Sequence, residues 1–261
     1  MTKNIFKILY LLIITIFIIS WFKIRELPEK NEVVPDLLKQ PIQTETARKD
    51  FSFSYRGKSY NVKPVADYEL WGLVVSINDI GAWYNYYHNE NSVNLKDVCV
   101  VWGKNVENGV YREKEIDFKS GEWTCYVNWS SGLKNPFQLN NFSNNHLLTA
   151  DPEIQDMIRN VNIGDQIHIK GNLADYAEAG QSFYRMTSIS RDDTNSTSRS
   201  GGACEIVYVD KMEVLKKNQI FWHLANTASK NIFFGLMILQ IILFFVDMKR
   251  HFRQNRENMI T

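Results

Sequence analysis

Hydrophobic residues gather into two long runs, one near each end of the chain. The first covers Ile5–Phe22 and the second covers Ile232–Val246. At about 1.5 Å of helical rise per residue, each run with its flanking residues approaches the roughly 30 Å hydrocarbon core of a bilayer. The pattern predicts two transmembrane helices, with about 200 residues between them in one compartment.

Each run has an alternative interpretation. The first resembles a signal peptide, because Lys3 and Lys7 precede its apolar stretch. The following segment, 20–23 (Ser-Trp-Phe-Lys), lacks the small-x-small pattern of a cleavage site, and Trp21 suits a membrane interface. An uncleaved anchor is therefore favoured. Because Gln240 interrupts the second run, a buried helix is its alternative.

A short basic tail sets the expected orientation. The second run is followed at once by Lys249, Arg250, His251, Arg253 and Arg256. The positive-inside rule places such a tail in the cytoplasm. Two spans then return the N-terminus to the same side. We expect a two-pass protein of the bacterial inner (plasma) membrane, with both termini cytoplasmic and the central domain extracytoplasmic.

Between the two anchors, the pattern changes at residue 51. Residues 26–50 contain Pro28, Pro35 and Pro41 among polar residues, which predicts an extended stalk. From Phe51 onward, short segments alternate apolar and polar residues, which is typical of strands. The expected parts are an N-terminal anchor (1–25), the stalk (26–50), an extracytoplasmic β domain (51–217), a pre-membrane segment with the second transmembrane helix (218–248), and a cytoplasmic tail (249–261).

The order of elements within the β domain narrows the fold class. Segments 51–55 and 58–62 flank Arg56-Gly57 as a hairpin, and Gly72 suggests a bend in the long strand 68–77. One short helix, 152–159, interrupts the strands. The chain is predicted to be mainly β, with an OB-like small barrel or a β-sandwich carrying one short helix, flanked by two transmembrane α-helices.

The charge distribution argues against nucleic acid as a partner. The whole chain has 30 Lys and Arg against 29 Asp and Glu, but residues 26–246 hold 22 against 27. The central part is thus acidic and lacks the basic stripe that phosphate backbones require. The expected partners are the lipid bilayer and another envelope protein or polymer.

Three cysteines, Cys99, Cys125 and Cys204, lie in the central part. In an oxidising compartment two of them are expected to pair. Cys99 and Cys125 lie in consecutive strand-like segments and are the first choice. Cys204 is then a small buried hydrophobe or the true partner of Cys125. No pair has the close spacing of a zinc site, so no metal is expected.

Several phrases resemble an uncharacterised family of bacterial membrane proteins. They cover segments 64–76, 97–103, 121–126, 143–148 and 202–205. This resemblance implies bacterial origin and a tethered extracytoplasmic β domain. It implies no activity and no site residues.

Catalytic signals are weak. His146 follows two asparagines and precedes Asp151, so these two residues are candidates for orienting a water molecule. A loop histidine beside a helix-capping aspartate is the simpler interpretation. Gly-x-Ser-x-Gly, Ser-x-x-Lys, His-Glu-x-x-His and phosphate-loop motifs are all missing from the sequence, and no cofactor is expected.

Aromatic side chains are the other unusual feature. Trp83, Tyr84, Tyr86 and Tyr87 crowd a loop rich in Asn and Asp, as ligand-contacting surfaces often do. These four are the candidate ligand-binding residues. The favoured function is a non-enzymatic, membrane-tethered extracytoplasmic module that binds a partner or envelope polymer. The alternative is a membrane-anchored envelope hydrolase that uses His146 and a nearby acid.

Overall fold

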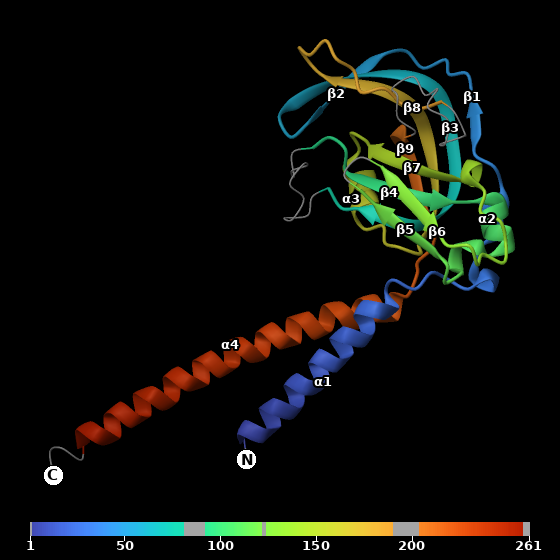
Figure 1. Cartoon of the computed structure of the whole chain (residues 1–261). Helices are drawn as coiled ribbons and strands as arrows, with labels where there is room; N and C mark the ends of the chain where they lie inside the picture. Colours follow the sequence, from blue (N-terminus) through green and yellow to red (C-terminus); the bar gives the residue numbers. More distant parts are fainter. Residues whose placement is uncertain (1, 81–91, 122–123, 190–203, 258–261) are drawn as a thin grey trace. The chain divides into compact units, whose positions relative to one another are not determined.

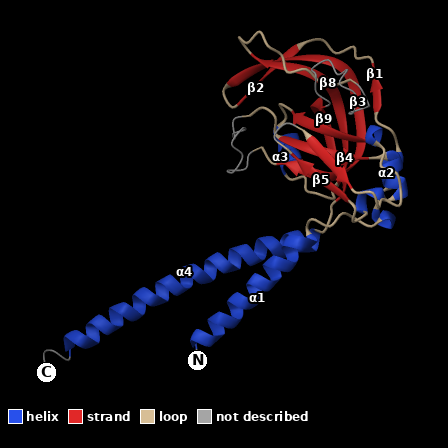
Figure 2. Ribbon diagram, viewed as in Figure 1, coloured by secondary structure: helices blue, strands red, loops and turns tan. Residues whose placement is uncertain are grey.

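The chain forms two compact units. The computed structural model describes residues 2–80, 92–121, 124–189 and 204–257. One unit combines residues 1–26 with 219–261, and the other covers residues 27–218 (Figure 1). The first is helical and the second is rich in strands (Figure 2).

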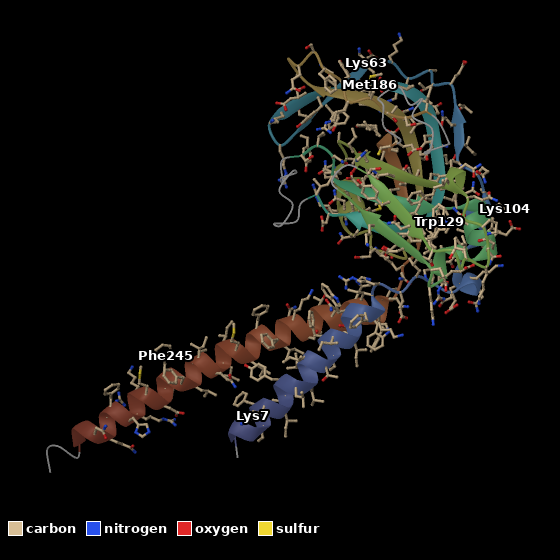
Figure 3. The ribbon with its side chains drawn as sticks, viewed as in Figure 1. Lys7, Lys63, Lys104, Trp129, Met186 and Phe245 are labelled. Atoms are coloured by element: carbon tan, nitrogen blue, oxygen red, sulfur yellow. A yellow bond between two sulfur atoms is a disulfide. The ribbon has the colours of Figure 1, made fainter. Side chains whose placement is uncertain are left out.

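Two long apolar helices make up the helical unit. They are α1 (Thr2–Lys23) and α4 (Ile220–Glu257). Both are long and apolar enough to cross a membrane, and their large apolar side chains, such as Phe245 in Figure 3, are mostly exposed. The expectation of two apolar helices at the two ends of the chain, flanking a sheet-rich domain, is confirmed.

Polar side chains join these two helices. The Tyr10 hydroxyl donates to Gln240 Oε1 at 3.2 Å, and Asn226 Nδ2 donates to Ser20 Oγ at 3.0 Å. Tyr10, in the first half of α1, contacts the later part of α4, whereas Ser20, near the end of α1, contacts the beginning of α4. The two helices therefore run antiparallel. Hydrogen bonds between apolar helices stabilise their pairing by about 1 kcal/mol each.

Five strands of the second unit pair in a closed ring. β3 pairs with β4 near its end and with β8 along most of its length, and the remaining pairs are β4–β7, β7–β9 and β9–β8. Only β7–β9 is parallel among these pairs of the described strands. The ring strands are β3 (Lys58–Asn78), β4 (Lys96–Val101), β7 (Phe142–Leu148), β8 (Gln166–Glu178) and β9 (Cys204–Lys216).

Smaller elements surround the ring. The strands β1 (Ile42–Thr44) and β2 (Phe51–Tyr55) pair with β3, and β5 (Ile116–Ser120) pairs with β6 (Cys125–Trp129) as a separate sheet. The short helices are Lys30–Glu32, Pro35–Leu38, α2 (Gly103–Asn108), Val110–Arg112, Leu139–Asn141 and α3 (Pro152–Arg159).

The turn between β2 and β3 is the hairpin that the sequence predicts. Tyr55 pairs with Lys58, and the two residues between them, Arg56 and Gly57, have φ values of 46° and 78°. Two successive positive φ angles give the tight turn whose twist matches paired strands.

Gly72 lies where β3 passes from one partner to the other. Strand β3 pairs with β8 up to Leu73 and with β4 from Leu73 onward. A Cβ atom at Gly72 would lie 2.9 Å from Cβ of Val100 on β4. The glycine therefore allows the close approach of two backbones at the bend.

Apolar side chains pack on both faces of β4 and β7. Val98, Val100 and Leu147 belong to the larger core, together with residues of β3, β8 and β9. Val101 and Phe142 point to the opposite face, where the β5–β6 sheet covers them. The covered outer face continues into the polar residues of the candidate site.

Residues 27–50 differ from the expected stalk. They belong to the second compact unit, Leu37 is completely buried, and β1 pairs with β3. The Tyr111 hydroxyl donates to the carbonyl of Pro28 at 2.9 Å. The prolines and charges suggested an extended stalk, but Leu27, Val33, Val34 and Leu37 are apolar enough to pack over the β5–β6 side of the domain.

Helix α3 connects β7 to β8. As the sequence predicts, Asp151 caps it, accepting hydrogen bonds from the backbone of Glu153 and Ile154. The other end of the helix meets Lys96, whose Nζ donates to the Arg159 and Val161 carbonyls at 2.6 and 3.0 Å. Burial lowers the pKa of Lys96.

Candidate active site

Strand pairing brings an acid and a histidine together. β4 and β7 run antiparallel with Asp97 opposite His146 and Cys99 opposite Asn144. Side chains two residues apart on a strand share a face. All four of these side chains therefore point to the outer face of the ring, at its polar end.

Asp97 fixes the orientation of the His146 ring. Its Oδ1 lies 2.5 Å from Nδ1 of His146 and accepts a second hydrogen bond, 2.6 Å long, from Nδ2 of Asn94. A carboxylate only accepts hydrogen bonds, so Nδ1 carries a proton. This leaves Nε2 as the nitrogen that exchanges its proton.

Cys204 completes the cluster. It begins β9, which runs parallel to β7 with Cys204 paired to Asn144. Asn144 Nδ2 lies 3.3 Å from Cys204 Sγ and 3.4 Å from His146 Nε2. The Asn144 amide thus lies beside both the Cys204 thiol and the His146 ring, and each of these two groups shifts the pKa of the other. Cys204, His146 and Asp97 thus form a triad on three neighbouring strands.

The triad shifts the pKa values of its own members. Burial is the largest influence on His146 and opposes its charged form, but contacts with Asp97 and Cys204 outweigh it and raise the pKa to about 10. Burial also opposes the Cys204 thiolate, yet His146, Asn144 and Thr124 lower the pKa of this thiol below its ordinary value. Both shifts favour a thiolate paired with an imidazolium.

A disulfide borders the triad. Cys99 of β4 is bonded to Cys125 of β6, with their Cα atoms 6.0 Å apart. The first-choice pairing of the sequence analysis is confirmed. The bond ties the β5–β6 sheet to the outer face of the ring, directly beside Asn144, whose Oδ1 lies 3.3 Å from Cys125 Sγ.

The candidates named from the sequence have different positions. His146 lies in the triad, with its side chain 13% exposed. Asp151 is occupied as the cap of α3, so the acid bonded to His146 is Asp97. The aromatic candidates Trp83, Tyr84, Tyr86 and Tyr87 lie outside the described residues.

Sequence reasoning missed the roles of Asp97 and Cys204. Cys204 is neither a hydrophobe isolated from polar groups nor the partner of Cys125. A sequence signal for Asp97 existed, because this acid directly precedes the apolar run 98–102, which is typical of a buried strand. Buried carboxylates are rare without a partner, so this position predicts a partner for Asp97.

A separate hollow of about 520 Å³ lies over β1, β3, β8 and β9, and no triad residue lines it. Arg48 spans it, donating to Asn172 Oδ1 at 2.8 Å and to Asp210 Oδ2 at 2.6 Å. The positive charge of Arg48 at the centre of this hollow is thus already paired within the protein.

Within residues 2–80, 92–121, 124–189 and 204–257, no group of three or more His, Cys, Asp or Glu side chains is arranged to hold a metal ion.

No protein-family model, curated protein or solved structure matches the chain.

Proposed function

We propose that this chain is a membrane-anchored, cysteine-dependent acyl hydrolase or acyltransferase. Cys204 is the nucleophile, His146 transfers the proton, and Asp97 orients His146. The proposal is carried by the position of His146, whose Nδ1 is held by Asp97 and whose Nε2 lies beside the Asn144 amide that also contacts Cys204 Sγ. A nucleophile, a base and a third group that orients the base are the required parts of covalent acyl transfer.

The first half-reaction follows from the ion pair. The Cys204 thiolate attacks the carbonyl carbon of an ester, thioester or amide. Asn144 Nδ2, 3.3 Å from Sγ, is a donor for the oxyanion that forms. The His146 imidazolium then gives its Nε2 proton to the leaving alcohol, thiol or amine, and an acyl-cysteine remains.

The second half-reaction regenerates the thiolate. Neutral His146 takes a proton from water or from an acceptor nucleophile, which attacks the thioester. Asp97 stabilises the imidazolium that forms again, since its carboxylate is buried and only 2.5 Å from Nδ1. Water gives hydrolysis, and an amine or alcohol gives transfer.

Acylation of Cys204 tests the proposal. The full-length protein in detergent micelles is mixed with p-nitrophenyl acetate, and the release of nitrophenol and the acetylated peptide are measured. We expect a burst of nitrophenol and an acetyl group on Cys204. Replacing the base typically lowers such rates by about 10²–10⁴, so His146→Asn should slow the burst by that factor.

His168 provides a matched control. It lies on β8 with 12% side-chain exposure and is hydrogen-bonded to Glu69 at 2.8 Å, but it contacts no cysteine thiol within the described part of the chain. His168→Asn should keep the full burst. Equal bursts in the wild type, His146→Asn and Cys204→Ser would disprove the proposal.

A binding and assembly role is the second proposal. Beyond the aromatic loop named from the sequence, β6 presents Tyr126 and Trp129, which are 54% and 46% exposed. Trp129 is labelled in Figure 3. Tyr126 directly follows the disulfide, so a partner or substrate on this strand would lie beside the triad. If Tyr126→Ala and Trp129→Ala abolish partner recovery from membranes without changing the burst, binding and catalysis are separate functions.

We place this activity on the extracytoplasmic side of a bacterial inner membrane. The disulfide suits an oxidising compartment, and the basic tail suits the cytoplasm. The bacterial family resemblance adds support for an envelope location.

We also propose an OB-like barrel. Its support is the closed pairing order β3–β4–β7–β9–β8, the parallel β7–β9 pair, and the position of α3 between β7 and β8.

A further inference from the structure

Three strands place two cysteines and an asparagine in one row. Cys99 pairs with Asn144, and Asn144 pairs with Cys204. Neighbouring strands lie roughly 4.8 Å apart, so the Cα atoms of Cys99 and Cys204 are about 10 Å apart. A disulfide requires Cα atoms within about 7 Å. Cys204 therefore cannot bond to Cys99, and Cys125 on the covering sheet is the sulfur left for it to attack.

Two contacts bring Cys204 toward Cys125. The Asn144 amide lies between them, with Nδ2 3.3 Å from Cys204 Sγ and Oδ1 3.3 Å from Cys125 Sγ. The two sulfurs thus flank a single side-chain amide. In addition, Oγ1 of Thr124, the residue before Cys125, lies 3.7 Å from Cys204 Sγ. A rotation of the Asn144 side chain would open the path between the sulfurs.

Cys99 is the leaving group of an attack on Cys125, and two hydroxyl groups contact its sulfur. Ser76 Oγ and Ser120 Oγ lie 3.2 and 3.1 Å from Cys99 Sγ. A disulfide sulfur has no hydrogen to donate, and the two hydroxyls are also hydrogen-bonded to each other, so one of them donates to the sulfur. Hydrogen bonds to a sulfur become stronger as negative charge develops on it. They favour departure of Cys99 as a thiolate, and a better leaving group accelerates exchange.

From this arrangement we propose an intramolecular thiol–disulfide exchange, in which Cys204 takes Cys125 from Cys99. The Cys204 thiolate forms a bond to Cys125 Sγ while the Cys125–Cys99 bond breaks. The electron pair of the broken bond moves to Cys99, which takes up the proton that Cys204 has given up. One disulfide and one thiol are present before and after, so no external oxidant or reductant is needed.

The exchange rests on the proposed function, because it uses the same Cys204 thiolate. In the exchanged form Cys204 is masked in a disulfide and cannot be acylated. The reverse attack by Cys99 restores it. The chain therefore carries a reversible means of switching the nucleophile off, beyond the acyl transfer itself.

A pair of matched variants tests the exchange. Full-length Cys99→Ser and Cys125→Ser proteins in detergent micelles are incubated with oxidised glutathione, alkylated, and digested without reduction for mass spectrometry. We expect Cys99→Ser to give the Cys125–Cys204 linked peptide as the main product. Cys125→Ser should give no Cys99–Cys204 link, because those positions are two strands apart. A folded Cys99→Ser protein without the link would overturn the proposal.

The wild-type protein provides a second measurement if Cys99→Ser fails to fold. Treatment with N-ethylmaleimide should label Cys204 in some molecules and Cys99 in others, since Cys99 carries the thiol in the exchanged form. Ser76→Ala with Ser120→Ala should slow the labelling of Cys99 several-fold. Labelling of Cys204 alone at every pH would overturn the proposal.

Acetylation separates the two proposals. If p-nitrophenyl acetate acetylates Cys204 in the wild type while neither the Cys125–Cys204 link nor Cys99 labelling is found, exchange fails and the proposed function stands. If Cys204 is not acetylated in any variant, the proposed function fails, and the linked peptide alone decides the exchange.

Discussion

At the scale of single residues, the triad is a charge pair, Cys204 with His146, supported by the Asp97 carboxylate. Asp97 and Cys204 raise the pKa of His146, which favours its positively charged form. In turn, His146 lowers the pKa of Cys204, which favours the thiolate. Asp97 is almost completely buried, so it has little solvent to stabilise it and depends on the His146 and Asn94 hydrogen bonds. Changes at any of the three residues should therefore alter the reactivity of Cys204 more than they alter the fold.

The pH dependence of Cys204 alkylation gives a direct test. Because His146 lowers the pKa of the thiol, the alkylation rate by iodoacetamide should rise at a lower pH than for an ordinary thiol. In His146→Asn, burial raises the pKa of Cys204 and only the Asn144 and Thr124 contacts still oppose it, so the rise should move to higher pH. Asp97→Asn should shift it in the same direction. Identical profiles for all three proteins would contradict the ion pair.

The sequence contained part of this site. His146 and Cys204 both stand out in the sequence, but nearness in the chain pairs His146 with Asp151. Asp97 is 49 residues away from His146 and meets it only because of the register between β4 and β7. Register depends on packing over the whole sheet, which a single sequence without its pairing partners does not display.

At the scale of secondary-structure elements, local sequence signals predicted individual turns, bends and helix caps. They did not predict which distant strands pair with one another. The β2–β3 hairpin, the bend at Gly72 and the capped helix α3 each have a chemical cause within a few residues. The parallel pairing of β7 with β9 joins segments some 60 residues apart. The packing of residues 27–50 was likewise hidden, because its few apolar side chains stand among prolines and charges.

Helix α3 allows the two aspartates to be compared. Asp151→Ala removes the cap that accepts from Glu153 and Ile154, which should cost about 1 kcal/mol in the free energy of unfolding. It should leave Cys204 acetylation unchanged, because Asp151 does not hold His146. Urea unfolding and the nitrophenol burst measure the two effects.

Glu153→Ala on the same helix is the control for this experiment. Its side chain is exposed and it is not the cap, so both quantities should stay near the wild-type values. A large loss of the burst in Asp151→Ala, with folding intact, would instead give Asp151 a part in catalysis.

At the scale of the whole molecule, the helical unit suits a bilayer and the β unit carries the proposed catalytic triad. The antiparallel contacts between α1 and α4 return both ends of the chain to the same end of the helical pair. Helix α4 has 38 residues, which is longer than the roughly 20 needed to cross a bilayer. Its basic C-terminal residues therefore extend beyond the apolar stretch, as expected for a cytoplasmic end.

Reporter fusions test the proposed topology. Alkaline phosphatase is active only outside the cytoplasm, so a fusion after Lys217 should be active and a fusion after Thr261 inactive. A reporter that fluoresces only in the cytoplasm should give the opposite pattern at the same two positions. The physical reason is the tail, where Lys249, Arg250 and Arg253 resist transfer across the membrane. An inactive phosphatase after Lys217 with an active one after Thr261 would invert the orientation, place the triad in a reducing compartment, and leave the Cys99–Cys125 disulfide without the environment that normally maintains it.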